Sequence, residues 1–229
     1  MQNTSVGINS EDFFKRIKKF LKNPLGDYTK ICSTNYVGVP YFLSISPQMN
    51  LTSEKREGKI NLFMQFYIDK NEERQSEIRQ TLYLNTNNNS IDKIYLLNER
   101  EYTDDELGCK SEKIVQYVQS ERLKFKHVFD FVENNNVEGY IIIANSDMFF
   151  DKSIEKLKFC DFTNKSMITL CRYEFDGMSL LKDCKLFNDG RPDSQDTWMF
   201  HSSINVESKF RKLFDFMLGK PGCDNKLIY

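Results

Sequence analysis

The stretch that decides the fold is Tyr140-Ile-Ile-Ile-Ala-Asn-Ser-Asp-Met-Phe-Phe-Asp151. Its apolar run, Tyr140–Ile143, is uninterrupted, which is typical of a short strand buried on both faces. The run ends abruptly in Asn145, Ser146 and Asp147. These polar side chains are therefore expected at the carboxyl end of a central strand, where open α/β sheets bind their ligands.

Strands and helices alternate on both sides of this stretch. Upstream, Ile60–Ile68 and Ile91–Leu97 are predicted strands joined by a helix over Asn71–Asn85, a βαβ unit that implies parallel strands. The other expected elements are helices over Asp104–Gln119, Phe125–Asn134 and Val206–Leu218, a helix capped by Asp151, and a strand over Met167–Tyr173. The alternation predicts an α/β domain over residues 59–229, with a mostly parallel sheet flanked by helices.

Residues 1–58 differ from this pattern and are expected to form an N-terminal extension. A helix start at Asn9–Asp12 precedes apolar residues on one helical face and lysines on the other. Such an amphipathic helix either packs on its own domain or lies on a membrane surface, and both alternatives stay open.

Composition excludes several classes of protein. The chain has 229 residues and a net charge of −1, so nothing suggests a nucleic-acid partner. It contains no apolar run long enough for a transmembrane segment and no signal-peptide core, so we expect a cytoplasmic protein, with peripheral membrane association open. The six cysteines are scattered without a Cys-x-x-Cys pair, which favours reduced thiols over a disulfide framework or a zinc knuckle.

The triplet Asn145-Ser146-Asp147 resembles the Asp-any-Asp signature of nucleotide-sugar glycosyltransferases with the Rossmann-like GT-A fold. In that family the motif holds Mn²⁺ or Mg²⁺ against the diphosphate of the donor. Asn145 stands where the family has its first Asp, so the resemblance implies Asp147 as the metal ligand. The alternative is an ordinary polar turn.

Further stretches between Ile60 and Tyr229 match the same family as an ordered set. They are Gln65-Phe66-Tyr67, Glu73-Arg74, Lys93–Leu97, Arg122–Lys126, Ser194–Trp198 and Gly222–Asn225. Members of the family usually continue beyond the last of these with another strand and a His-containing tail. This chain ends at Tyr229, which is consistent with a truncated or shortened member.

The resemblance implies a metal-dependent transfer of a sugar from a nucleotide-diphosphate donor to an unknown glycan, lipid or protein acceptor. The implied donor-binding residues are Gln65, Tyr67, Arg74, Arg122, Asn145 and Asp147. On the acceptor side, Asp196 is the candidate catalytic base, because an inverting transfer needs a carboxylate to take the proton of the hydroxyl. Asp224 is the second candidate for that role, and Trp198 and Asn225 are the candidate acceptor contacts.

Each residue also has a purely structural alternative. Arg74 is close in sequence to acidic residues and would form a surface ion pair, Asp196 would sit in a turn, Trp198 in the core, and Asp224 at a helix cap. The segment Glu174–Pro192 is long enough to act as a lid. Two other classes stay open: a nucleotidyltransferase, although Asp69–Glu72 is not its usual glycine-rich basic loop, and an inactive binding or scaffold module.

Overall fold

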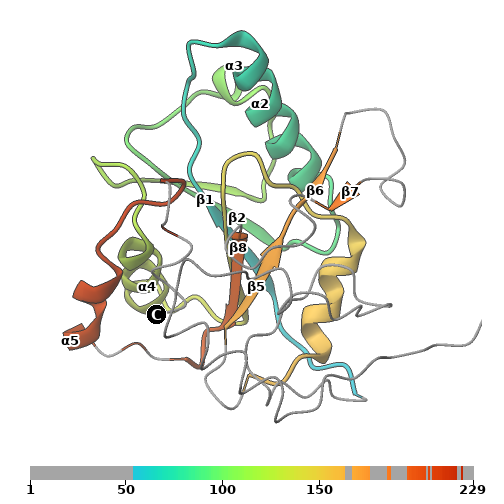
Figure 1. Ribbon diagram of the computed structural model, residues 1–229, viewed down its shortest axis with the longest axis vertical. Helices are drawn as coiled ribbons and strands as arrows, with labels where there is room; N and C mark the ends of the chain where they lie inside the picture. The colour runs from blue at the N-terminus through green and yellow to red at the C-terminus, as the bar shows by residue number, and fades with distance from the viewer. Residues whose placement is uncertain are drawn as a thin grey trace, which may run out of the picture.

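The computed structural model describes residues 54–162, 167–175, 185–186, 195–204, 206, 208–220 and 223. The expected N-terminal helix, most of the segment Glu174–Pro192, and the candidate residues Asp224 and Asn225 lie outside the described residues. In the described part, a sheet runs through the middle of the molecule with helices on both sides (Figure 1).

The sheet has six strands in the order β3-β2-β1-β4-β8-β5. Their bounds are β1 Ile60–Met64, β2 Lys93–Asn98, β3 Ile114–Val118, β4 Tyr140–Ala144, β5 Ile168–Cys171 and β8 Gln195–His201. The β1–β2, β2–β3 and β1–β4 pairings are parallel, whereas β8 runs antiparallel to both β4 and β5. The predicted α/β fold is confirmed, and β4 occupies the predicted interior position. A separate two-stranded sheet pairs β6, Tyr173–Glu174, with β7, Lys185–Leu186.

Two of the helices begin after an Asn or Asp whose side chain caps them. Asn71 caps α2, Glu72–Thr86, by accepting a hydrogen bond from the backbone N–H of Arg74. Asp151 caps the 3₁₀ helix η1, Lys152–Phe159, by accepting from Ser153. The remaining helices are α3 Asp104–Leu107, α4 Phe125–Asn134, α5 Ser208–Arg211 and the 3₁₀ helix η4 Lys212–Phe214.

Two predicted helices are wrong in extent. The helix expected over Asp104–Gln119 stops at Gly108, which adopts a left-handed conformation at φ +73°, and β3 follows it. The Ile-Val-Gln-Tyr-Val sequence of β3 is rich in β-branched and aromatic residues, which favour strands. The helix expected over Val206–Leu218 is reduced to α5 and η4, and Leu213 is 66% exposed.

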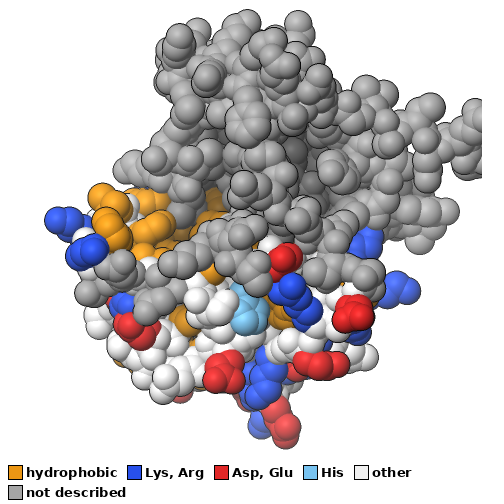
Figure 2. All heavy atoms as spheres, turned by 90° about the horizontal axis from the view of Figure 1, so that it is seen from below, with side chains coloured by type: hydrophobic (Ala, Val, Ile, Leu, Met, Phe, Trp, Pro, Cys, Tyr) orange, Lys and Arg blue, Asp and Glu red, His pale blue; other side chains and the backbone are white. Residues whose placement is uncertain are grey.

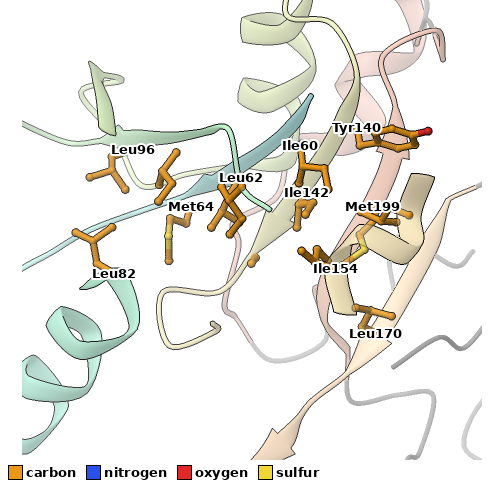
Figure 3. Packing of buried hydrophobic residues seen from close by; sticks show 14 of the residues in the cluster. Ile60, Leu62, Met64, Leu82, Leu96, Tyr140, Ile142, Ile154, Leu170 and Met199 are labelled. Carbon is orange, nitrogen blue, oxygen red and sulfur yellow. The ribbon is translucent and has the colours of Figure 1, made fainter. Parts of the chain in front are cut away.

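Both faces of the sheet are buried. Alternate residues of β4 belong to two separate hydrophobic clusters: Tyr140 and Ile142 to one, Ile141 and Ile143 to the other. Figure 3 shows the first cluster, in which side chains of β1 and β4 pack with Leu82 of α2 and Ile154 of η1. The second cluster lies against α4. A strand held from both faces fixes the position of the residues that follow it.

Figure 2 shows one face of the molecule. On the face shown in Figure 2, basic and acidic side chains of the described residues are interspersed, and hydrophobic side chains gather at one edge. Among the described residues, no helix combines the length and the apolar character needed to cross a membrane.

Gly139, directly before β4, is the position at which we expect a small substitution to cost most. Its φ is +104°, and a Cβ there would lie 2.4 Å from the backbone oxygen of Lys59. Because a backbone atom cannot move aside cheaply, Gly139→Ala should lower the free energy of unfolding by about 2 to 4 kcal/mol, measured by urea denaturation.

Gly108→Ala is the matched control. Gly108 also has a positive φ, +73°, but a Cβ there would meet the flexible side chain of Arg79 at 3.2 Å. Its loss should stay at about 1 to 2 kcal/mol, the usual cost of a left-handed non-glycine residue. Equal losses for the two variants would contradict the close approach to Lys59.

Candidate ligand-binding site at the strand ends

The topology collects polar residues at one edge of the sheet. Thr197 of β8 pairs with Ala144 of β4 on one side and with Leu170 of β5 on the other. Since β8 is antiparallel to both neighbours, the amino end of β8 meets the carboxyl ends of β4 and β5. The polar residues brought to this edge are Asn145 after β4, Arg172 after β5 and Asp196 at the start of β8.

Asp196 is the centre of this group. Its Oδ1 accepts a hydrogen bond of 2.8 Å from Nδ2 of Asn145, and its Oδ2 accepts one of 2.6 Å from Nη1 of Arg172. The residue is only 9% exposed and lies in a strand, so the alternative of a turn residue is wrong. Burial raises the pKa of Asp196, the bonds from Arg172 and Asn145 oppose that rise, and the negative charge of Asp147 adds to it.

Asp147 forms a second group with Arg74 and Tyr67. Nη1 of Arg74 donates to Oδ2 of Asp147 at 2.9 Å and to Oε2 of Glu77 at 2.5 Å. Burial by itself would lower the pKa of Arg74, but the charge of Asp147 and the hydrogen bonds with Tyr67, Glu77 and Asp147 outweigh it and leave the pKa raised. Arg74 therefore has the surface ion pair expected of it and, in addition, faces the end of β4.

Gln65 ties the end of β1 to this edge. Its backbone oxygen accepts a hydrogen bond of 2.7 Å from Oγ of Ser146, and its Oε1 accepts one of 3.2 Å from the backbone N–H of Leu123. Arg122, the neighbour of Leu123, is thereby held close to the strand ends.

The side chains of Arg122 and Asn145 both lie close to Gly219. Arg122 donates from Nη2 to the oxygen of Gly219 at 3.3 Å, and a Cβ on that glycine would lie 3.3 Å from Nη2 of Arg122 and 3.5 Å from Oδ1 of Asn145. The six candidate donor-binding residues thus lie along one edge of the sheet. Their binding role stays a prediction.

Trp198 does not face this edge. Its side chain is fully buried, its ring packs against Phe125 at 4.9 Å between centroids, and its Nε1 donates to Oε1 of Gln195 at 3.0 Å. No ring face is open for stacking on a sugar, so the expected acceptor contact is wrong and the alternative of a core residue holds.

Arg172 is the site residue that the sequence analysis missed. It was included in the predicted strand Met167–Tyr173, whereas β5 ends one residue before it. The signal was present, because a charged residue shortly after an apolar strand is the feature that singled out Asp147. Only the antiparallel insertion of β8 brings it next to Asp196.

The residues at this edge fit a divalent cation only in the company of a phosphate-bearing ligand. Oδ1 of Asn145 is buried and has no hydrogen-bond partner among the described residues, and the carboxylates of Asp147 and Asp196 lie near it. No cluster of three or more Asp, Glu, His or Cys suited to an ion occurs within the described ranges. Mg²⁺ is commonly held by one or two carboxylates, with substrate phosphates completing its coordination, and the oxygen donors here match that pattern.

A separate groove of about 690 Å³ lies beside α2. It is lined by Asp69, Glu72, Gln75, Ser76, Arg79, Gln80, Tyr83 and Gly108. None of the six candidate donor-binding residues lines it.

Comparison with known proteins gives a fold-level likeness alone. No family model and no curated protein matches the chain. One similar solved structure is a 4-diphosphocytidyl-2C-methyl-D-erythritol synthase, with a TM-score of 0.41 and 8% identity, covering 75% of this chain and 86% of that chain. Another is the 4-diphosphocytidyl-2C-methyl-D-erythritol synthase from Anaerococcus prevotii, with a TM-score of 0.38 and 12% identity, covering 75% and 82%. Scores at this level carry no information on activity.

The ion pair between Arg172 and Asp196 predicts a pH-dependent loss of stability in Arg172→Met. The arginine opposes the rise in the pKa of Asp196, so its removal should raise that pKa further. At neutral pH the variant either keeps a buried carboxylate without its counter-ion or protonates it, and we expect the free energy of unfolding to fall by about 2 kcal/mol.

This loss should shrink as the pH falls through the raised pKa of Asp196, because a protonated carboxyl group needs no counter-ion. Urea denaturation of wild type and variant at neutral and acidic pH measures the difference. In an Asp196→Asn background, Arg172→Met should cost the same at both pH values. A loss that does not depend on pH in the wild-type background would contradict the pairing.

Proposed function

We propose that the protein is a glycosyltransferase that binds a nucleotide-diphosphate sugar at the strand ends and transfers the sugar to an acceptor hydroxyl. The observation that supports this most is the 2.8 Å hydrogen bond from Asn145 to Asp196. It joins the candidate donor-binding residues to the candidate base in one connected group, at the edge where α/β sheets bind ligands.

In this proposal the arginines bind the diphosphate. A guanidinium group matches two phosphate oxygens at once, and Arg74 and Arg122 approach the end of β4 from α2 and from the segment before α4. Asp147, with Oδ1 of Asn145, would hold Mn²⁺ or Mg²⁺. The cation would stabilise the negative charge that develops on the departing diphosphate.

Asp196 would accept the proton of the acceptor hydroxyl. Burial raises its pKa, and a carboxylate is a better general base when its pKa lies closer to the working pH. Both of its oxygens are engaged, Oδ1 by Asn145 and Oδ2 by Arg172. A hydroxyl can reach Asp196 only if one of these hydrogen bonds opens. We expect the bond from Arg172 to open, because its guanidinium can bind a phosphate of the donor instead.

An inactive binding module is the second candidate, because each of the two carboxylates at the strand ends is neutralised by an arginine of the same chain. A nucleotidyltransferase finds less support. The segment after β1 does not present a row of basic residues, and the backbone N–H of Asp69 is held by Oε1 of Gln75 at 2.6 Å.

The test combines binding with turnover. A panel of UDP, GDP and CDP and their sugar conjugates, with and without Mn²⁺, should raise the melting temperature for at least one nucleotide. For the conjugate that binds, release of nucleoside diphosphate in the presence of simple glycoside acceptors measures transfer. No shift with any nucleotide would contradict the proposal, and binding without turnover would favour the inactive module.

Asp196→Asn separates donor binding from catalysis. Because Asn cannot take a proton, transfer should fall by about two to four orders of magnitude, while the nucleotide shift in Mn²⁺ stays nearly unchanged. Asp105→Asn, an exposed position in the first turn of α3, is the matched control and should leave both measurements unchanged. Full transfer by Asp196→Asn would remove Asp196 from the base role.

A further inference from the structure

The carboxylate proposed to bind the cation is already occupied by a positive charge from its own chain. Oδ2 of Asp147 accepts the bond from Nη1 of Arg74 at 2.9 Å, and the side chains of Arg74 and Asp147 are 33% and 24% exposed. Hydrogen bonds with Tyr67 and Glu77 hold the guanidinium in place. A divalent cation at that oxygen would be next to this fixed positive charge, and like charges so close repel strongly at a partly buried site.

We propose that Arg74 is an internal counter-ion that keeps Asp147 closed to the cation until a diphosphate takes over the guanidinium. The inference rests on the proposed function and adds that the cation and the diphosphate bind together, because the diphosphate releases Asp147 for the cation. In the ligand-free protein Arg74 neutralises Asp147. In the complex the guanidinium binds phosphate oxygens, and the cation binds Asp147 together with other phosphate oxygens of the same ligand.

The chemistry of both groups allows this exchange. A guanidinium has five N–H donors, so Arg74 can turn toward a phosphate while keeping its bonds to Tyr67 and Glu77. Asp147, once released, provides one charged oxygen ligand, and Oδ1 of Asn145, buried without a partner, is close to the same edge. One carboxylate and one amide oxygen bind a hard cation weakly, and phosphate oxygens complete its coordination.

A neighbouring pair repeats the arrangement. Arg172 bonds to the buried Asp196 and to the exposed Glu174, as Arg74 bonds to Asp147 and Glu77. Every carboxylate that follows β4 or begins β8 at this edge is therefore neutralised within the described residues. The two ion pairs therefore compete with any single ion that would bind Asp147, Asp196, Arg74 or Arg172, and a phosphate–cation complex brings both of the partners that the exchange requires.

The test measures the affinity of the protein for Mn²⁺ alone and for inorganic pyrophosphate alone, each by calorimetric titration. The paramagnetic resonance signal of free Mn²⁺ is a second readout of cation binding. The full chain is used throughout, and pyrophosphate is titrated in EDTA. In Arg74→Met the cation competitor is gone, so Mn²⁺ should bind about tenfold more tightly than in wild type. Pyrophosphate should bind about tenfold more weakly, because its guanidinium is gone.

Asp147→Asn should give the opposite signs. Mn²⁺ alone should lose affinity, and pyrophosphate alone should gain it, because Arg74 no longer has a competing anion. In Arg74→Met/Asp147→Asn the gain in Mn²⁺ affinity should disappear. Arg100→Met is the matched control, since Arg100 also pairs with a glutamate, Glu106, but lies near α3, and it should change neither affinity.

The signs decide the outcome. Weaker or unchanged Mn²⁺ binding in Arg74→Met overturns the inference, because it would make Arg74 a support of the cation site or a bystander. Failure of Mn²⁺ to bind any variant also overturns it, and leaves the proposed function to the nucleotide panel. Absence of nucleotide binding in that panel would contradict the function, whereas opposite signs for Mn²⁺ and pyrophosphate would still establish the exchange at Asp147.

Discussion

The pairing of β8 between β4 and β5 is the constraint on which the candidate site depends. Thr197 is paired with a residue of a neighbouring strand on each side, so the amino end of β8 is held against the carboxyl ends of two strands that are distant in sequence. Without this antiparallel insertion, Asp196 and Arg172 would not meet Asn145. The position of β4 in turn depends on burial of its two faces by separate hydrophobic clusters, which leaves it no freedom to shift register.

Charge neutralisation is the second constraint. Partly buried carboxylates are costly unless they are paired and hydrogen-bonded, and the structure satisfies Asp147 and Asp196 with one arginine each. Both arginines lie at the ends of elements, Arg74 in the first turn of α2 and Arg172 directly after β5, where a side chain can reorient without disturbing the core. A site built in this way is stable without a ligand and still has polar groups that a ligand can take over.

Local patterns explain what could be predicted from the sequence. The helix Phe125–Asn134 has apolar residues at helical spacing and the strand at Tyr140 is an uninterrupted apolar run, and the placement of both is confirmed. The helix predicted over Asp104–Gln119 is wrong because Leu107, Ile114 and Val118 have helical spacing by coincidence, while Gly108 ends the helix.

The candidate site was predictable only where its residues follow a recognisable strand or belong to the ordered set of motifs that resembles a known family. Asp147 follows an apolar run, and Arg74 lies in the first turn of a capped helix, so both were identified. Arg172 was missed because its partner is reached through β8, whose pairing no local pattern specifies. Trp198 was misassigned for the same reason: polar residues precede it in the sequence, but its strand is paired on both sides and its side chain is buried.

The geometry gives a physical reason why position 145 is an asparagine and not an aspartate. Asn145 donates its amide N–H to Asp196 at 2.8 Å. An aspartate at position 145 would place two carboxylates at that distance with Asp147 close by, and one of them would have to be protonated or bound to a cation at all times. Asparagine keeps the oxygen that faces Gly219 and replaces the other with a donor. The site thereby loses one charged cation ligand and gains a neutral link to Asp196, which is the arrangement expected where arginines, and not a permanently bound ion, neutralise the carboxylates.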